Sequence, residues 1–126
     1  MPVKTVEADT STTLSTSVRH EPGVAIIDLS GEIDAFAEGA LNAAYTEAAS
    51  RDSTAILLNF SEVDYINSTG IALIVSLLAQ ARKAHRRLLT CGLSDHYLEI
   101  FQITRLADFM DIFADEASAL ADASSS

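Results

Sequence analysis

The sequence predicts one α/β domain built on a mixed sheet, with an antiparallel N-terminal hairpin, a parallel remainder and about four helices. After the opening hairpin, apolar runs of strand length alternate with segments of helical periodicity, a pattern typical of parallel strands. The run from Thr54 to Phe60 is almost continuously apolar, which indicates a strand covered on both faces in the sheet interior. A chain of 126 residues fits a single domain with a real core.

The N-terminal part predicts a flexible arm followed by a hairpin. Residues 1–11 are mostly polar or acidic, so we expect a loose arm. Apolar and polar positions alternate from Thr12 to His20, as in an edge strand with one solvated face. Residues 21–23 (Glu-Pro-Gly) favour a turn. The second strand is expected at residues 24–30, and residues 31–34 close it.

Asp34 is a good N-cap for a first helix that extends to about Ser50. Apolar residues recur behind it at helical spacing: Ala37, Leu41, Ala44, Tyr45 and Ala48. Capping alone accounts for an aspartate at this position, because aspartate is among the best capping residues.

The segment 64–70 (Asp-Tyr-Ile-Asn-Ser-Thr-Gly) joins the central strand to the most apolar helix of the chain. Asn67 and Ser68 are both good N-cap residues, so the helix is expected to begin at about Ser68. Polar residues at 76, 80 and 83 predict a helix with one thin solvated stripe. The basic residues 82–87 suit the negative end of its dipole, an explanation that we favour over an anion-binding patch.

The remaining elements follow from the same signals. Residues 88–91 predict a strand, Gly92 ends it, and Ser94 caps a third helix that carries Tyr97, Leu98, Phe101 and Ile103. Residues 109–113 predict a short last strand, and an alanine-rich helix begins at Asp115. The expected domain covers residues 12–121, and residues 122–126 are expected to be a frayed tail.

Composition limits the classes of partner. The formal net charge of −10 disfavours nucleic acid and anionic membrane surfaces. No apolar run approaches the length of a membrane span, and the first residues lack the apolar core of a signal peptide, so we expect no membrane insertion and a cytoplasmic protein. The one cysteine, Cys91, is expected to be a small buried thiol.

Motifs of common enzyme and cofactor sites are absent from the sequence. Neither GxxxxGK[ST], GxGxxG nor GxSxG occurs, and the three histidines show no metal-ligand spacing, so we expect no cofactor, no metal and no enzyme activity. Glu32, Asp34 and Asp64 could form an acidic site, but solvated or capping carboxylates explain them more simply.

Ser68 places a hydroxyl at a helix N-terminus. The first-turn amides and the positive end of the helix dipole stabilise an anion at such a position, so a phosphate on Ser68 would be compatible with the fold. The alternative is that residues 67 and 68 only cap the helix, and spacing by itself favours that alternative.

Three segments carry a resemblance to a known family. Residues 31–34 (Gly-Glu-Ile-Asp), 65–71 (Tyr-Ile-Asn-Ser-Thr-Gly-Ile) and 104–106 (Thr-Arg-Leu) resemble, in this order, the STAS domain of bacterial anti-sigma factor antagonists. The resemblance extends from about Thr12 to Leu120. The family has Asp where this chain has Asn67, and Gly where it has Arg105, so Arg105 is expected to be strained if the backbone there needs a positive φ.

The resemblance implies a STAS-like domain over residues 12–121 that binds an anti-sigma factor serine kinase and is inactivated when Ser68 is phosphorylated. A metal-dependent serine phosphatase would restore the binding-competent form. The implied partner-binding residues are Asp34, Asn67, Ser68, Thr69, Gly70 and Ile71. Two alternatives remain: a non-phosphorylated STAS-like interaction subunit of a lipid-transport or stress-signalling complex, and a small nucleotide-binding or acyl-transfer enzyme.

Overall fold

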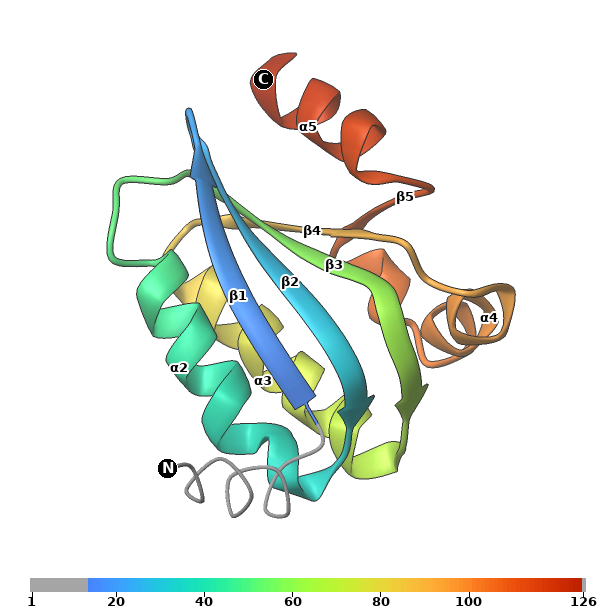
Figure 1. Ribbon diagram of the computed structural model, residues 1–126. Coiled ribbons are helices and arrows are strands. Elements are labelled where there is room, and N and C mark those ends of the chain that lie inside the picture. The colour runs from blue at the N-terminus through green and yellow to red at the C-terminus, as the bar shows by residue number, and fades with distance from the viewer. Residues whose placement is uncertain (1–13, 126) are drawn as a thin grey trace.

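The protein is built on one five-stranded sheet with the strand order β1-β2-β3-β4-β5 (Figure 1). The computed structural model describes residues 14–125. The strands are β1 (Leu14–Glu21), β2 (Val24–Ile33), β3 (Ala55–Ile66), β4 (Arg87–Cys91) and β5 (Asp111–Phe113). β1 is antiparallel to β2, and every other neighbouring pair is parallel, which confirms the predicted mixed sheet.

Helices cover the two faces of the sheet unequally. The α-helices are α2 (Glu38–Ala48), α3 (Ser68–Lys83), α4 (Asp95–Ile103) and α5 (Glu116–Ser125), and two 3-10 turns are η1 (Ala35–Ala37) and η2 (Leu106–Asp108). Figure 1 shows α2 and α3 against one face and α5 against the opposite face. The larger apolar core fills the side of α2, α3 and α4, and a smaller one lies beneath α5.

β3 occupies the centre of the sheet, as its apolar sequence predicts. It pairs with β2 on one side and with β4 on the other, and Ile56, Leu57 and Leu58 are fully buried. Alternate side chains point to opposite faces of a strand. Ile56 and Leu58 accordingly belong to the larger core and Leu57 to the smaller one, so both faces of β3 are covered.

Both central strands are longer than predicted. β3 continues past Phe60 to Ile66, and β2 continues past Ser30 to Ile33. Their mutual pairing persists across two register irregularities up to the pair Ile33–Ile66, whereas β4 pairs with β3 only as far as Asn59. Pairing with a distant partner strand therefore extends these strands through a polar stretch that local periodicity does not mark.

Several predicted boundaries in the C-terminal part need correction. The last strand begins at Asp111 and not at residue 109, because η2 turns the chain just before it and Phe109 is exposed. Ile103, which was expected on the apolar face of α4, is 70% exposed. Helix α5 extends to Ser125 and so includes most of the expected tail, whereas the expected arm 1–11 and Ser126 lie outside the described residues.

Arg105 has a left-handed backbone, with φ of 67°, which is the condition under which strain was expected at this position. A side chain other than glycine pays roughly 1–2 kcal/mol in this region. The Arg105 N–H donates to the carbonyl of Gln102 (3.1 Å), and its Nε donates to Asp108 (2.6 Å) in an exposed pair. The turn between α4 and η2 thus carries local backbone strain at Arg105.

Candidate site at the start of helix α3

The segments 31–34 and 65–71, far apart in sequence, meet at the C-terminal ends of two neighbouring strands. β2 and β3 are parallel and end side by side, with Ile33 opposite Ile66 (Figure 1). The backbone N–H of Asn67 donates to the carbonyl of Ile33 (3.2 Å). The pairing of two parallel strands therefore brings the resemblance segments into direct contact.

Asn67, and not Ser68, caps helix α3. Its Oδ1 accepts a hydrogen bond from the N–H of Gly70 (2.8 Å), and its carbonyl accepts one from the N–H of Ile71 (2.9 Å). Ser68 is the first residue of the helix and is exposed, and its hydroxyl makes no hydrogen bond within residues 14–125. The capping role and an accessible hydroxyl are thus divided between two neighbouring residues.

Gly70 allows the start of α3 to lie directly against the end of β2. A Cβ atom at this position would come within 2.1 Å of the Ile33 carbonyl oxygen and 2.8 Å of its carbon. No side-chain adjustment can relieve such an overlap, because the obstructing atoms belong to the backbone. Gly70 is also buried, so its contribution to the site is to fix where α3 begins.

Asp34 caps η1, the short turn that leads into α2. Its Oδ1 accepts from the N–H of Phe36 (2.9 Å), and the α-helix begins only at Glu38. The expectation that Asp34 caps the long helix itself was therefore wrong by one turn, because a 3-10 turn intervenes. Phe36 lies in this turn and is 71% exposed, and the turn itself contacts β2 and α3.

Tyr97 supports the site from helix α4, through a contact that no sequence pattern predicted. Its hydroxyl accepts a hydrogen bond from the N–H of Ile66 (2.9 Å), at the end of β3 where β4 no longer provides a partner. The Tyr97 side chain is buried. The two residues are 31 positions apart, so no local spacing could have revealed the contact.

The polar positions predicted on α3 are exposed, but the exposed face of the helix is wider than the predicted thin stripe and partly apolar. In addition to Ser76 and Gln80, the exposed face includes Ala72, Val75 and Ala79. One helical face takes only three to four residues in two turns. Some residues of the unbroken apolar run 71–75 therefore had to lie outside the core. This run was the sequence feature that could have predicted an apolar exposed face.

Large apolar side chains are exposed on the elements that lie next to the start of α3 and on α3 itself. Phe36, Tyr65 and Val75 are 71%, 49% and 45% exposed and come from η1, β3 and α3. Together with Ser68, Thr69, Ala72 and Ala79 they form what we call the α3 surface. Ile71 is half-buried and packs against the core, so it contributes less to this surface.

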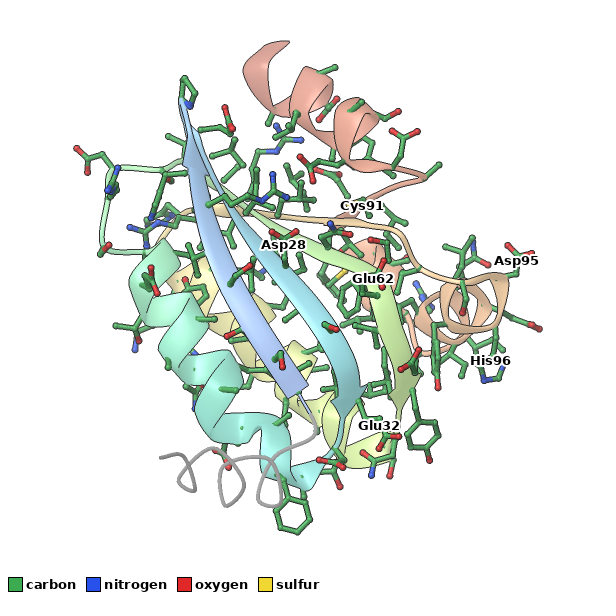
Figure 2. All side chains as sticks on the ribbon, viewed as in Figure 1. Asp28, Glu32, Glu62, Cys91, Asp95 and His96 are labelled. Atoms are coloured by element: carbon green, nitrogen blue, oxygen red, sulfur yellow. The ribbon has the colours of Figure 1, made fainter. Side chains whose placement is uncertain are left out.

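The rim of the α3 surface is acidic. Glu32, Asp34 and Asp64 lie at the ends of β2 and β3, and Figure 2 shows Glu32 at this end of the sheet. Within residues 14–125, no three His, Cys, Asp or Glu side chains are grouped so that they could hold a metal ion. The basic residues of the segment 82–87 lie in and just after the last turn of α3, at the far end of the helix, roughly 24 Å away at 1.5 Å per residue.

A hollow of about 450 Å³ lies elsewhere, between α4, η2 and β5, and none of the predicted site residues lines it. The site at Ser68 is thus an outward-facing surface formed by a helix start and two strand ends. No helix in the described part of the chain has the length and apolar character needed to span a membrane.

Comparison with known proteins agrees with this arrangement. The sequence profile of the STAS domain matches residues 15–119. The anti-sigma-B factor antagonist of Listeria monocytogenes is 30% identical over 86 residues, which are 68% of this chain and 75% of the relative.

Solved structures share the fold. An anti-sigma factor antagonist from Mycobacterium paratuberculosis has a TM-score of 0.76 at 20% identity, over 87% of this chain and 93% of that one. The Bacillus cell fate determinant SpoIIAA in its phosphorylated form has a TM-score of 0.62 at 20% identity, over 86% and 98%. The profile match covers most of the chain, and the order of the strands and the placement of the helices agree with it. The protein therefore belongs to the STAS domain family.

Proposed function

We propose that this protein is an anti-sigma factor antagonist that binds an anti-sigma factor serine kinase and is inactivated when that kinase phosphorylates Ser68. The observation that carries the proposal is the division of roles at the start of α3, where Asn67 caps the helix and Ser68 presents an exposed hydroxyl. The Listeria relative bears the name of an anti-sigma-B factor antagonist, and SpoIIAA has been solved in a phosphorylated form.

The helix start can accommodate a phosphate. The backbone N–H groups of Ser68 and Thr69 have no hydrogen-bond partner within residues 14–125. Such first-turn amides, together with the helix dipole, favour a negative group by roughly 0.3–1 kcal/mol at an exposed site. Phosphorylation would therefore leave the domain folded and change only the surface that the partner meets.

The effect on the partner complex would be electrostatic and steric. A phosphoserine adds about 1.5–2 negative charges at neutral pH. Here it would join an acidic rim on a protein whose formal net charge is already −10. The α3 surface combines an acidic rim with exposed apolar side chains, so we expect its partner to present apolar and basic groups. A phosphate in the middle of that contact would separate the apolar surfaces.

The partner-binding set of the proposal is Asp34, Asn67, Ser68, Thr69, Gly70 and Ile71, extended by Phe36 and Val75. Gly70 acts by position, since it is buried. Asn67 replaces the family's Asp without loss of the cap, because the carbonyl oxygen of the amide accepts the same hydrogen bond. The missing charge bears on recognition by the kinase and not on the fold.

The chain is a substrate and a switch in this proposal, with no catalytic activity of its own, and it acts in the cytoplasm. A metal-dependent serine phosphatase would remove the phosphate. The change from Asp to Asn67 also favours one second candidate, a STAS-like interaction subunit of a lipid-transport or stress-signalling complex that is never phosphorylated.

Intact-mass measurement and phosphosite mapping of the protein from growing and stressed cells separate the two candidates. We expect the mass of one phosphate, mapped to Ser68, in one of the two conditions. A phosphate on Thr69 would move the switch by one residue. Unmodified protein in both conditions would favour the interaction subunit and contradict the proposal.

A further inference from the structure

Helix α5 covers an apolar strip on the face of the sheet opposite α2 and α3 (Figure 1). The strip consists of Val24, Ile26, Ala55, Leu57, Leu89 and Cys91. Among residues 116–123 of α5, for which burial is described, only Ala119 is fully buried on it, with Leu120 and Ala123 partly buried. An isolated ten-residue helix is not stable in water, so α5 keeps its conformation only while it is docked.

Arg19 ties the first residue of α5 to the sheet. From β1, its guanidinium donates to both carboxylate oxygens of Glu116 (2.7 and 3.1 Å). The same group donates to both oxygens of Asp28 on β2 (2.6 and 2.8 Å). One arginine thus holds two carboxylates that would otherwise repel each other, and Asp115 adds a third negative charge nearby.

Arg87 makes the corresponding attachment near the other end of the helix. From β4, it donates to Asp122 of α5 and to Asp111 of β5 (2.8 Å). Glu116 and Asp122 are six positions apart, so the two arginines hold α5 at both ends of its short apolar contact. We call these two arrangements the latch.

The latch is accessible to solvent. The side chains of Arg19, Glu116, Arg87 and Asp122 remain between 32% and 46% exposed. Ion pairs at such positions are screened by salt, with a Debye length of about 10 Å at 0.1 M and 3 Å at 1 M. The larger core contains no such pair, because it is formed by apolar side chains. Attachment of α5 should therefore weaken with salt far more than the rest of the domain does.

We propose that α5 is an electrostatically latched cover that lifts from the apolar strip while the rest of the domain stays folded, and that ionic strength controls how often it lifts. The open form exposes the strip to solvent. This inference does not depend on Ser68, which lies at the start of α3 on the other side of the sheet.

Cys91 reports the opening directly, because it is the one cysteine of the chain and part of the strip. It is 1% exposed. Burial, with the nearby carboxylates of Glu116, Asp115 and Asp28, raises the pKa of its thiol to about 11. Figure 2 shows Cys91 and Asp28 on the α5 side of the sheet. The thiol is therefore unreactive in the closed form and becomes reactive when α5 lifts.

The test is the rate at which a small aromatic disulfide reagent labels Cys91 in the full chain under native conditions, divided by the rate for a cysteine peptide at the same salt. We expect the normalised rate to rise as salt increases from 0.05 to 1 M, concentrations chosen to span the screening range. At low salt, Glu116→Gln and Asp122→Asn should each raise it about three- to tenfold. Asp108→Asn is the matched control, since it breaks the exposed pair with Arg105, and should leave the rate unchanged.

Low concentrations of urea distinguish opening of the cover from unfolding of the domain. Lifting of one helix exposes little surface, so the labelling rate should depend on urea much less steeply than global unfolding does. Equal urea dependence would show that Cys91 reacts only in the unfolded chain and would overturn the proposal. It is likewise overturned if Glu116→Gln and Asp122→Asn label at the same rate as Asp108→Asn.

Discussion

Gly70→Ala is the sharpest test of how the site is positioned. The added Cβ would lie 2.1 Å from the Ile33 carbonyl oxygen, a backbone atom that cannot rotate away. The start of α3 must then move away from the end of β2. The hydrogen bond from the Asn67 N–H to the same carbonyl, now 3.2 Å long, would be strained or lost.

The expected cost follows from three contributions. Overpacking in a buried position costs about 1–3 kcal/mol. Loss of the backbone hydrogen bond adds about 0.5–1.5 kcal/mol. The better helix propensity of alanine returns at most about 1 kcal/mol. We therefore expect Gly70→Ala to lower the free energy of unfolding by about 2–3 kcal/mol.

Urea unfolding followed by circular dichroism measures this change, and Gly39→Ala is the control. Gly39 is an exposed helical glycine with nothing within 4 Å of an added Cβ. Alanine there should stabilise the protein by about 0.5 kcal/mol. If the two variants are equally stable, the close approach of α3 to β2 does not determine the position of the site.

Four further predictions concern the switch, the surface, the turn and the pH response. Ser68→Ala should keep the fold and partner binding, whereas Ser68→Asp should keep the fold but weaken the complex, as measured by calorimetric titration with the anti-sigma factor; equal affinities would contradict the switch. Phe36→Ser should weaken the same complex by about 1–2 kcal/mol with little change in stability, and Ile103→Ser, at an equally exposed apolar side chain elsewhere, should not. Arg105→Gly should raise the free energy of unfolding in urea by about 1 kcal/mol, because it removes the strain of a left-handed backbone at a non-glycine residue and loses only the exposed ion pair with Asp108. An unchanged free energy would mean that the turn is unstrained. Hydrogen bonds from Arg19 on β1 lower the pKa of the Asp28 carboxylate. Ionised Asp28 therefore stabilises the fold above the unfolded-state pKa of about 3.9, and this contribution is lost as the pH falls below that value. Asp28→Asn should accordingly flatten the acid limb of a curve of unfolding free energy against pH.

Much of the fold follows from local patterns in the sequence. The apolar run at residues 54–60 predicts the central strand, and the structure confirms it. The alternation at 12–20 predicts the edge strand, which the structure confirms from Leu14, the first described residue. The cap of α3 was also expected from the residues at that position, whereas only the family resemblance pointed to Arg105 as a residue that a positive φ would strain. Strand periodicity and helix capping involve residues only a few positions apart, so a sequence displays them directly.

The site was only partly predictable for the same reason. The sequence indicated Asn67 and Ser68 together at the helix start, but the geometry of the Gly70 N–H decided which one caps it. The exposure of Phe36 was only weakly indicated by the sequence, in which Phe36 falls outside the helical spacing of its apolar neighbours. Its exposure depends on η1, a turn that separates Asp34 from α2.

By itself, the sequence determined the order of strands and helices, the mixed sheet and the exposed serine at a helix start. Only the tertiary structure decided which distant residues support that arrangement. The contact of Tyr97 with Ile66 spans 31 positions, and that of Arg19 with Glu116 spans 97. Such contacts depend on how parallel strands bring remote segments to the same edge or face of the sheet, and no short-range pattern encodes that path.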